Sequence, residues 1–215
     1  MQNGRPSNMD SLLLKSGRIK KANAMLGVVC DGVGSLADGG FASGIAVKML
    51  SDWFNNVKSI KRIGLALRDE VLSINSYIVE EAKKRSLDTA STLTALLLVE
   101  SDYYITHIGD SRIYCYNDGA FTILTSDDVT KSGKLTGYIG KYDIFLQYSE
   151  GTAIDKVFLI CSDGLYNRIS EHVLEKEINS WNKRSSKEPL ERLAQHVIEL
   201  GEKDNISLAF MRLES

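Results

Sequence analysis

The chain has 215 residues, with 26 Lys and Arg against 28 Asp and Glu, and 43% of its residues are apolar. This balance is typical of a folded protein with a buried core rather than a disordered chain. A formal charge of -2 without a long basic run argues against a nucleic-acid binder, and no apolar stretch is long enough to cross a membrane. With only two prolines and no linker-like break, we expect a single domain over residues 1–215.

The first residues and the cysteines indicate the cellular compartment of the protein. The first ten residues are polar and have no signal-peptide pattern, so we expect a cytoplasmic protein. Cys30, Cys115 and Cys161 lie in apolar runs without Cys-x-x-Cys spacing. This arrangement predicts buried, reduced thiols rather than disulfides or zinc ligands.

The first half of the chain predicts two strands and then two helices. Short apolar runs at 9–14 and 24–30 indicate buried strands, and the second run stops at a glycine-rich turn. From residue 41 the apolar residues recur three or four apart, which predicts amphipathic helices over 41–57 and 63–82.

The second half is richer in strands. Four strand-like stretches, read as an antiparallel meander, lie at 91–99, 103–108, 111–116 and 120–124. A polar, irregular connection follows, and the remaining predicted elements are strands at 143–148, 156–161 and 205–212 and helices around 173–178 and 190–200. Strands and helices are segregated rather than alternating, which favours an α+β layered fold. The stretch Leu93 to Val99 is apolar on both faces, as in a sandwich of sheets with helices outside.

Five aspartates fall at element boundaries, each beside an apolar run: Asp10, Asp31, Asp110, Asp163 and Asp204. Taken singly, each is better explained by a turn or a helix cap. If adjacent strands bring these carboxylates together, their mutual repulsion requires a cation. Oxygen-only ligands select Mg²⁺ or Mn²⁺, and the backbone carbonyl of Gly32 is a further candidate ligand.

The order of these motifs resembles the metal-dependent protein phosphatases, the type 2C serine/threonine phosphatase family, in a short, bacterial-like form. The family's Arg followed by Asn-Glu-Asp is similar to Arg-Pro-Ser-Asn-Met-Asp at 5–10. The other matching segments are Asp-Gly-Val-Gly at 31–34, Ala-Ser-Thr at 90–92, Gly-Asp-Ser-Arg at 109–112, Ser-Asp-Gly-Leu at 162–165 and Asp-Asn-Ile at 204–206. They follow the family order along nearly the whole chain.

The resemblance implies a four-layer αββα sandwich of two antiparallel sheets flanked by helix pairs, with two or three Mg²⁺ or Mn²⁺ ions at one edge. Carried over residue by residue, Asp31 would bridge two ions and Gly32 would bind through its carbonyl. Asp163 and Asp204 would complete the first metal site.

The remaining roles also come from the resemblance. Asp10 would hold metal-bound water, and Asp110 would bind a third, weaker ion with help from Asp163. Arg5 would bind the substrate phosphate, a task suited to a planar fork that is always charged. Arg5, Asp31 and Asp163 are therefore the predicted catalytic residues.

The implied activity is hydrolysis of phosphoserine and phosphothreonine in proteins by a metal-activated water, opposing a serine/threonine kinase. Two positions depart from the family: Met9 stands where a Glu ligand is usual, and Val33 stands where some members carry His. The chain also begins four residues before Arg5, so a first strand usual in the family is expected to be absent.

These departures leave a second hypothesis open, a weakened pseudophosphatase that acts as a binding or regulatory module. A metal-dependent nuclease is a third, weaker hypothesis, because nucleases also use carboxylates and two ions. The near-neutral charge and the family order of the motifs count against the nuclease.

Overall fold

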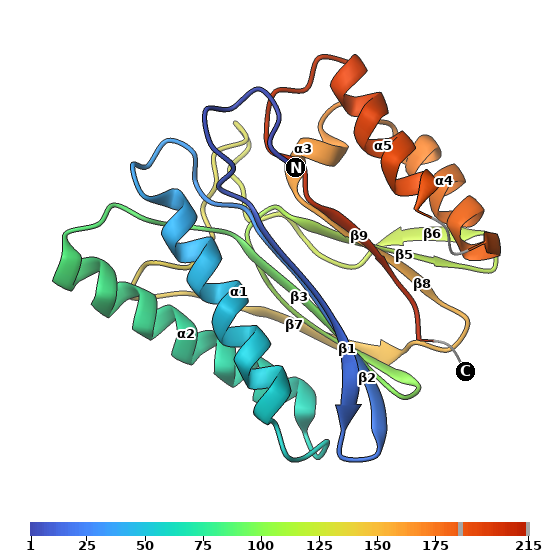
Figure 1. Cartoon of the computed structure of the whole chain (residues 1–215), viewed down its shortest axis with the longest axis horizontal. Helices are drawn as coiled ribbons and strands as arrows, with labels where there is room; N and C mark the ends of the chain where they lie inside the picture. Colours follow the sequence, from blue (N-terminus) through green and yellow to red (C-terminus); the bar gives the residue numbers. More distant parts are fainter. Residues whose placement is uncertain (185–186, 214–215) are drawn as a thin grey trace.

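Two antiparallel sheets face each other, and a pair of helices covers the outer face of each sheet (Figure 1). This computed structural model describes residues 1–184 and 187–213. The first sheet has the strand order β1-β2-β3-β4-β7. Its strands are β1 (Ser11–Ile19), β2 (Ala22–Cys30), β3 (Leu93–Val99), β4 (Asp102–Ile108) and β7 (Gln147–Thr152).

The second sheet has the strand order β6-β5-β8-β9. Its strands are β5 (Arg112–Asn117), β6 (Ala120–Ile123), β8 (Val157–Cys161) and β9 (Leu208–Met211). Every pair of neighbouring strands in both sheets is antiparallel. The predicted α+β sandwich of two antiparallel sheets flanked by helix pairs is therefore confirmed.

Helices α1 (Gly39–Asn56) and α2 (Ile63–Arg85) cover the first sheet, and α4 (Glu171–Arg184) and α5 (Glu188–Glu199) cover the second (Figure 1). The short helix α3 (Asp163–Tyr166) directly follows β8 and was not predicted, because four residues are too few to show a helical period. Trp181 lies in α4, with its ring centroid 5.2 Å from that of Phe210.

The apolar residues form three layers of core, one between the sheets and one beneath each helix pair. The position of β3 explains why it is apolar on both faces: all seven of its side chains are buried between the helices and the second sheet. Phe158 of β8 packs between the sheets, edge to face with Tyr103 at 5.4 Å. The three cysteines are free and buried, as predicted.

Three sequence interpretations were wrong. Strand β1 is an edge strand and not a buried one: its side chains alternate, and Leu12 and Leu14 are 43% and 52% exposed. The four strands read as one meander divide between the two sheets, because the chain crosses from β4 to β5 at residues 109–111. The strand placed at 143–148 begins later, as β7.

None of the helices in the described ranges, 1–184 and 187–213, combines the length with the apolar character that crossing a lipid bilayer requires.

The layer between the sheets should dominate stability. Replacing Phe158, which is fully buried, with Ala is expected to lower the free energy of unfolding by about 3–5 kcal/mol, through lost apolar burial and the cavity left behind. Phe145 is 81% exposed, so Phe145→Ala should cost less than about 0.5 kcal/mol. Urea unfolding of both variants measures the difference, and equal losses would contradict the assignment of the core.

Candidate active site

Strand register brings the ends that carry the predicted aspartates to one edge of the sandwich. In the first sheet Ser11 pairs with Cys30, so Asp10 and Asp31 flank the same end of the β1–β2 pair. In the second sheet Cys161 pairs with both Arg112 and Leu208, so the ends of β5, β8 and β9 also coincide. We call Asp10, Asp31, Asp110, Asp163 and Asp204 the carboxylate set.

The Asp-Gly pairs at 31–32 and 163–164 place their glycines where another segment of the chain passes too closely for a side chain. A Cβ on Gly32 would lie 2.7 Å from the carbonyl oxygens of Met9 and Gly39. A Cβ on Gly164 would lie 2.1 Å from the carbonyl oxygen of Asn205. The glycines therefore serve close packing that draws the segments of Asp10 and Asp204 toward Asp31 and Asp163.

Hydroxyl groups hold Asp10 and Asp31 in place. The hydroxyl of Ser162 donates to the Asp10 carboxylate at 3.0 Å, and the backbone N–H of Asp31 donates to the hydroxyl of Thr92 at 2.9 Å. Ser162 and Thr92 lie in the motif segments at 162–165 and 90–92, but the sequence assigned neither residue a role. Their motif membership was the only signal available, because a hydroxyl partner depends on tertiary contacts.

The carboxylates repel one another strongly. Burial raises the pKa of Asp31 well above its ordinary value, and the charges of Asp10 and Asp163 raise it further. Burial also raises the pKa values of Asp10 and Asp163, and the Asp31 and Asp163 carboxyls are close enough to hydrogen-bond each other. Burial, followed by the charge of Asp163, raises the pKa of Asp110 to about 6.

Asp204 differs from the others because it pairs with Arg5. The Arg5 guanidinium donates two hydrogen bonds to the Asp204 carboxylate, at 3.0 and 2.6 Å. Burial alone would raise the pKa of Asp204, but hydrogen bonds from Arg5 and from the Asn205 backbone keep it below its ordinary value. The predicted phosphate-binding residue is thus bonded to a predicted metal ligand.

The donor set fits a hard divalent cation in its chemistry. The Oδ1 atom of Asp163 is buried and has no hydrogen-bond partner, which is the condition of a ligand atom prepared for a cation. The ligands are oxygens, as Mg²⁺ and Mn²⁺ prefer. Among residues 1–184 and 187–213, however, no three His, Cys, Asp or Glu side chains are grouped closely enough to hold one ion. Asp204 would have to leave Arg5 to take part.

Met9 offers no carboxylate at the position where the family has Glu. Its backbone carbonyl accepts hydrogen bonds from the Ser43 hydroxyl at 2.6 Å and from the Gly32 N–H at 3.3 Å. Its sulfur lies beside Gly39, at the start of α1. Met9 therefore contributes packing and backbone contacts at the edge of the site.

The polar segment 126–141 is anchored to the site at its start. The Asp127 carboxylate accepts two short hydrogen bonds from Arg112, at 3.0 and 2.7 Å. Asp128 exchanges hydrogen bonds with Gly109: its carboxylate accepts from the Gly109 N–H at 2.9 Å, and its own N–H donates to the Gly109 carbonyl at 2.7 Å.

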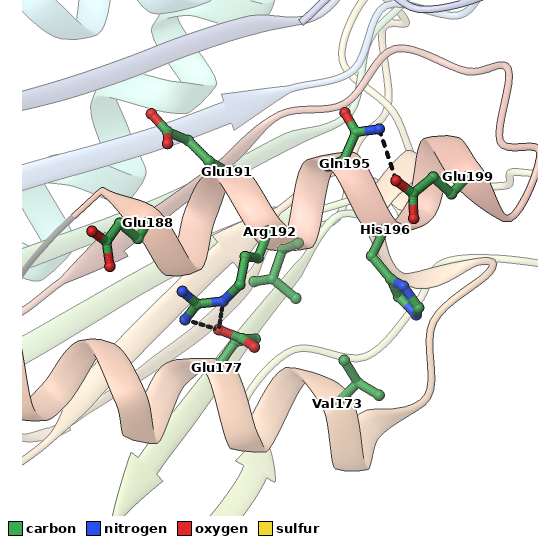
Figure 2. A pocket seen from close by; sticks show the side chains of 9 residues that line it. Val173, Glu177, Glu188, Glu191, Arg192, Gln195, His196 and Glu199 are labelled. Atoms are coloured by element: carbon green, nitrogen blue, oxygen red, sulfur yellow. Dashed lines mark hydrogen bonds and ion pairs between the residues drawn. The ribbon is translucent and has the colours of Figure 1, made fainter.

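The surface is also hollowed away from the carboxylate set. A hollow of about 600 Å³ lies between α4 and α5, where Arg192 reaches across to Glu177 and is bordered by further Glu side chains (Figure 2). None of its lining residues belongs to the carboxylate set. A smaller hollow of about 290 Å³ reaches Asn8 and Asp10, between β1 and α5.

Comparison with known proteins agrees with the fold and identifies the family. The family model for protein phosphatase 2C matches residues 2–199. A serine/threonine phosphatase, Stp, of Listeria welshimeri is 27% identical over 215 residues, covering 87% of this chain and 84% of that protein. The PstP phosphatase of Mycobacterium tuberculosis is 26% identical, covering 87% of this chain and 40% of that protein.

A solved structure of the Stp1 phosphatase from Staphylococcus aureus superposes with a TM-score of 0.87 at 20% identity. It covers 99% of this chain and 91% of that chain, which shows the shared fold. The chain belongs to the protein phosphatase 2C family, whose members are metal-dependent, and it is a protein phosphatase.

Repulsion within the carboxylate set should be measurable as a stability cost without metal. The folded pKa of Asp31 lies above its unfolded value, so ionised Asp31 destabilises the fold at neutral pH, and this penalty disappears as the pH falls through the raised pKa. In chelator at pH 7.5, Asp31→Asn is expected to raise Tm by about 2–6 °C. The gain should shrink toward pH 5.

A matched control is Asp155→Asn, since Asp155 is exposed and lies outside the site. Its left-handed backbone, with φ of 58°, also suits Asn. Thermal unfolding of this variant should follow the wild type at each pH. A lower Tm for Asp31→Asn at pH 7.5 would contradict the repulsion.

Proposed function

We propose that this protein phosphatase hydrolyses phosphoserine and phosphothreonine in protein substrates, with Mg²⁺ or Mn²⁺ held by the carboxylate set. The observation that carries the proposal is the convergence of these carboxylates at one edge, where burial raises the pKa values of four of them, Asp10, Asp31, Asp110 and Asp163. The charges of neighbouring carboxylates raise those of Asp31, Asp110 and Asp163 further. Such a group of like charges is stabilised by a cation. When bound, the ions activate water as the nucleophile and offset charge on the phosphoryl group.

The assignment of ligands follows the order of the motifs. Asp31, the carbonyl of Gly32, Asp163 and Asp204 would hold two ions. Asp10, fixed by Ser162, would orient water beside them. Asp110 and Asp163 would hold a third, weaker ion.

Arg5 would bind and orient the phosphate through its guanidinium, which is 51% exposed at its side chain. The same guanidinium hydrogen-bonds to Asp204. Arg5 and a cation would therefore compete for the Asp204 carboxylate.

The cysteines support water, rather than a thiolate, as the nucleophile. Cys30 and Cys161 are completely buried, and burial raises the pKa of each thiol far above its ordinary value. A thiol must ionise to attack phosphorus. The third cysteine, Cys115, is also buried and has a raised pKa.

The partners follow from the activity. They are phosphorylated proteins and, by inference, a serine/threonine kinase whose products this enzyme reverses. The cytoplasmic location stays a prediction. The pseudophosphatase hypothesis depended on Met9 and on the start of the chain, and it loses weight because Asp163 and Asp204, which a degenerate site would be expected to lose, remain.

Loss of a bridging carboxylate should remove activity without unfolding the protein. We expect Asp31→Asn and Asp163→Asn to lower the rate of hydrolysis of a phosphothreonine peptide in Mn²⁺ by at least about 100-fold. Groups that only orient a metal ligand already contribute up to about that factor to activity, and a direct ligand should contribute at least as much. Asp155→Asn should keep the activity of the wild type. Full activity in either ligand variant would overturn the assignment of the site.

Arg5 should influence metal and phosphate binding in opposite directions. Arg5→Gln removes the cation that competes for Asp204, so Mn²⁺ affinity measured by calorimetry should rise about 3- to 10-fold, while KM for the phosphopeptide rises about 10-fold. Arg168→Gln is the control, because it removes the same positive charge from a residue that pairs with Glu202, at 3.6 Å, and not with Asp204. Equal effects of the two substitutions would show that only net charge matters.

A further inference from the structure

We propose that Tyr166 is a positioning residue that fixes Asp110 relative to Asp163. Tyr166 is the last residue of α3, whose first residue is Asp163. Its hydroxyl donates to the backbone carbonyl of Asp110 at 2.7 Å. One short helix therefore carries a predicted metal ligand at one end and, at the other, the group that holds the chain at a second predicted ligand. This inference rests on the proposed function.

The chain at Asp110 has particular need of such a contact. It lies where the polypeptide leaves the first sheet at the end of β4 and enters the second sheet at Arg112, so neither ladder holds it. On one side, Asp128 exchanges hydrogen bonds with Gly109. On the other side, the Tyr166 hydroxyl holds the Asp110 carbonyl. The backbone held in this way sets the direction of the Asp110 carboxylate.

The Tyr166 ring is itself held by a cation. The Cζ atom of Arg112 lies 3.7 Å from the centroid of the ring, close enough for a cation–π contact. Arg112 is fixed in turn by its two short hydrogen bonds to Asp127 and by a third, from Nη1 to the Tyr114 hydroxyl at 3.2 Å. The Arg112 and Asp127 side chains are only 23% and 21% exposed, so this pair is stronger than an exposed ion pair.

The arrangement gives Arg112 of the Gly-Asp-Ser-Arg motif a role away from the substrate. Arg112 links the start of segment 126–141, through Asp127, to the ring of Tyr166, and the hydroxyl of Tyr166 passes that constraint to Asp110. Asp110 and Asp163 are the residues that would hold the third ion of the proposed function, so their relative position would influence its affinity. The hydroxyl of Tyr166 would therefore act on that affinity through the backbone of Asp110.

The test compares Mn²⁺ binding to the full chain by titration calorimetry and by the Mn²⁺ paramagnetic resonance signal, without substrate. Tyr166→Phe keeps the ring beneath Arg112 and removes only the hydroxyl. We expect the weakest Mn²⁺ site to lose affinity about 10-fold, within the range known for groups that orient ligands. The tighter sites should be unchanged, and Tm should stay within about 3 °C of the wild type.

Tyr142→Phe is the matched control, since it also removes a tyrosine hydroxyl but Tyr142 is 75% exposed and lies outside the contacts among Arg112, Tyr166 and Asp110. It should bind Mn²⁺ like the wild type. Arg112→Lys is a second variant: it keeps the charge but loses the planar fork, and it should weaken the same site.

The inference is overturned if Tyr166→Phe matches the wild type at every Mn²⁺ site, if Tyr142→Phe weakens the last site equally, or if the wild type has no separable weaker site. A wild-type chain that binds no Mn²⁺ at all would instead refute the proposed function, and this inference with it. The two failures are therefore distinguishable.

Discussion

Repulsion among carboxylates that are largely withdrawn from water is the constraint on which the rest of this structure depends. Asp31 lies close to Asp10 and Asp163, and burial makes ionisation of each costly. A natural fold keeps such a cost only where another group offsets it. The antiparallel register of both sheets aligns their strand ends and so forces the carboxylates together. A divalent cation is the group that would offset their negative charge.

Groups of the chain itself offset part of that negative charge. Arg5 pairs with Asp204, and the Asp31 and Asp163 carboxyls lie within hydrogen-bond reach of each other. Both devices use groups that the chemistry needs elsewhere: the guanidinium for phosphate and the carboxylates for metal. Metal binding, release of Arg5 and binding of the phosphate are thereby linked. The buried oxygen of Asp163 that has no partner marks the place where the internal compensation ends.

Local patterns predicted the elements well, and tertiary contacts decided the rest. Helical periodicity located α1 and α2 to within a few residues, because each buries one continuous stripe. The apolar runs located β3 and β8, but periodicity does not reveal which sheet a strand joins, so the crossing at Gly109 was missed. The aspartates were predicted from their boundary positions. The bonds of Arg5 to Asp204 and of Tyr166 to Asp110 join residues 199 and 56 apart, and no local signal encodes them.

The most direct test of the account is the anomalous scattering of Mn²⁺ in crystals of the wild-type chain. The account predicts manganese peaks beside Asp31 and Asp163, with the Asp204 carboxylate turned from Arg5 toward one of them. Manganese bound away from these residues, or the absence of any bound ion at saturating Mn²⁺ with the Arg5–Asp204 pair intact, would contradict it.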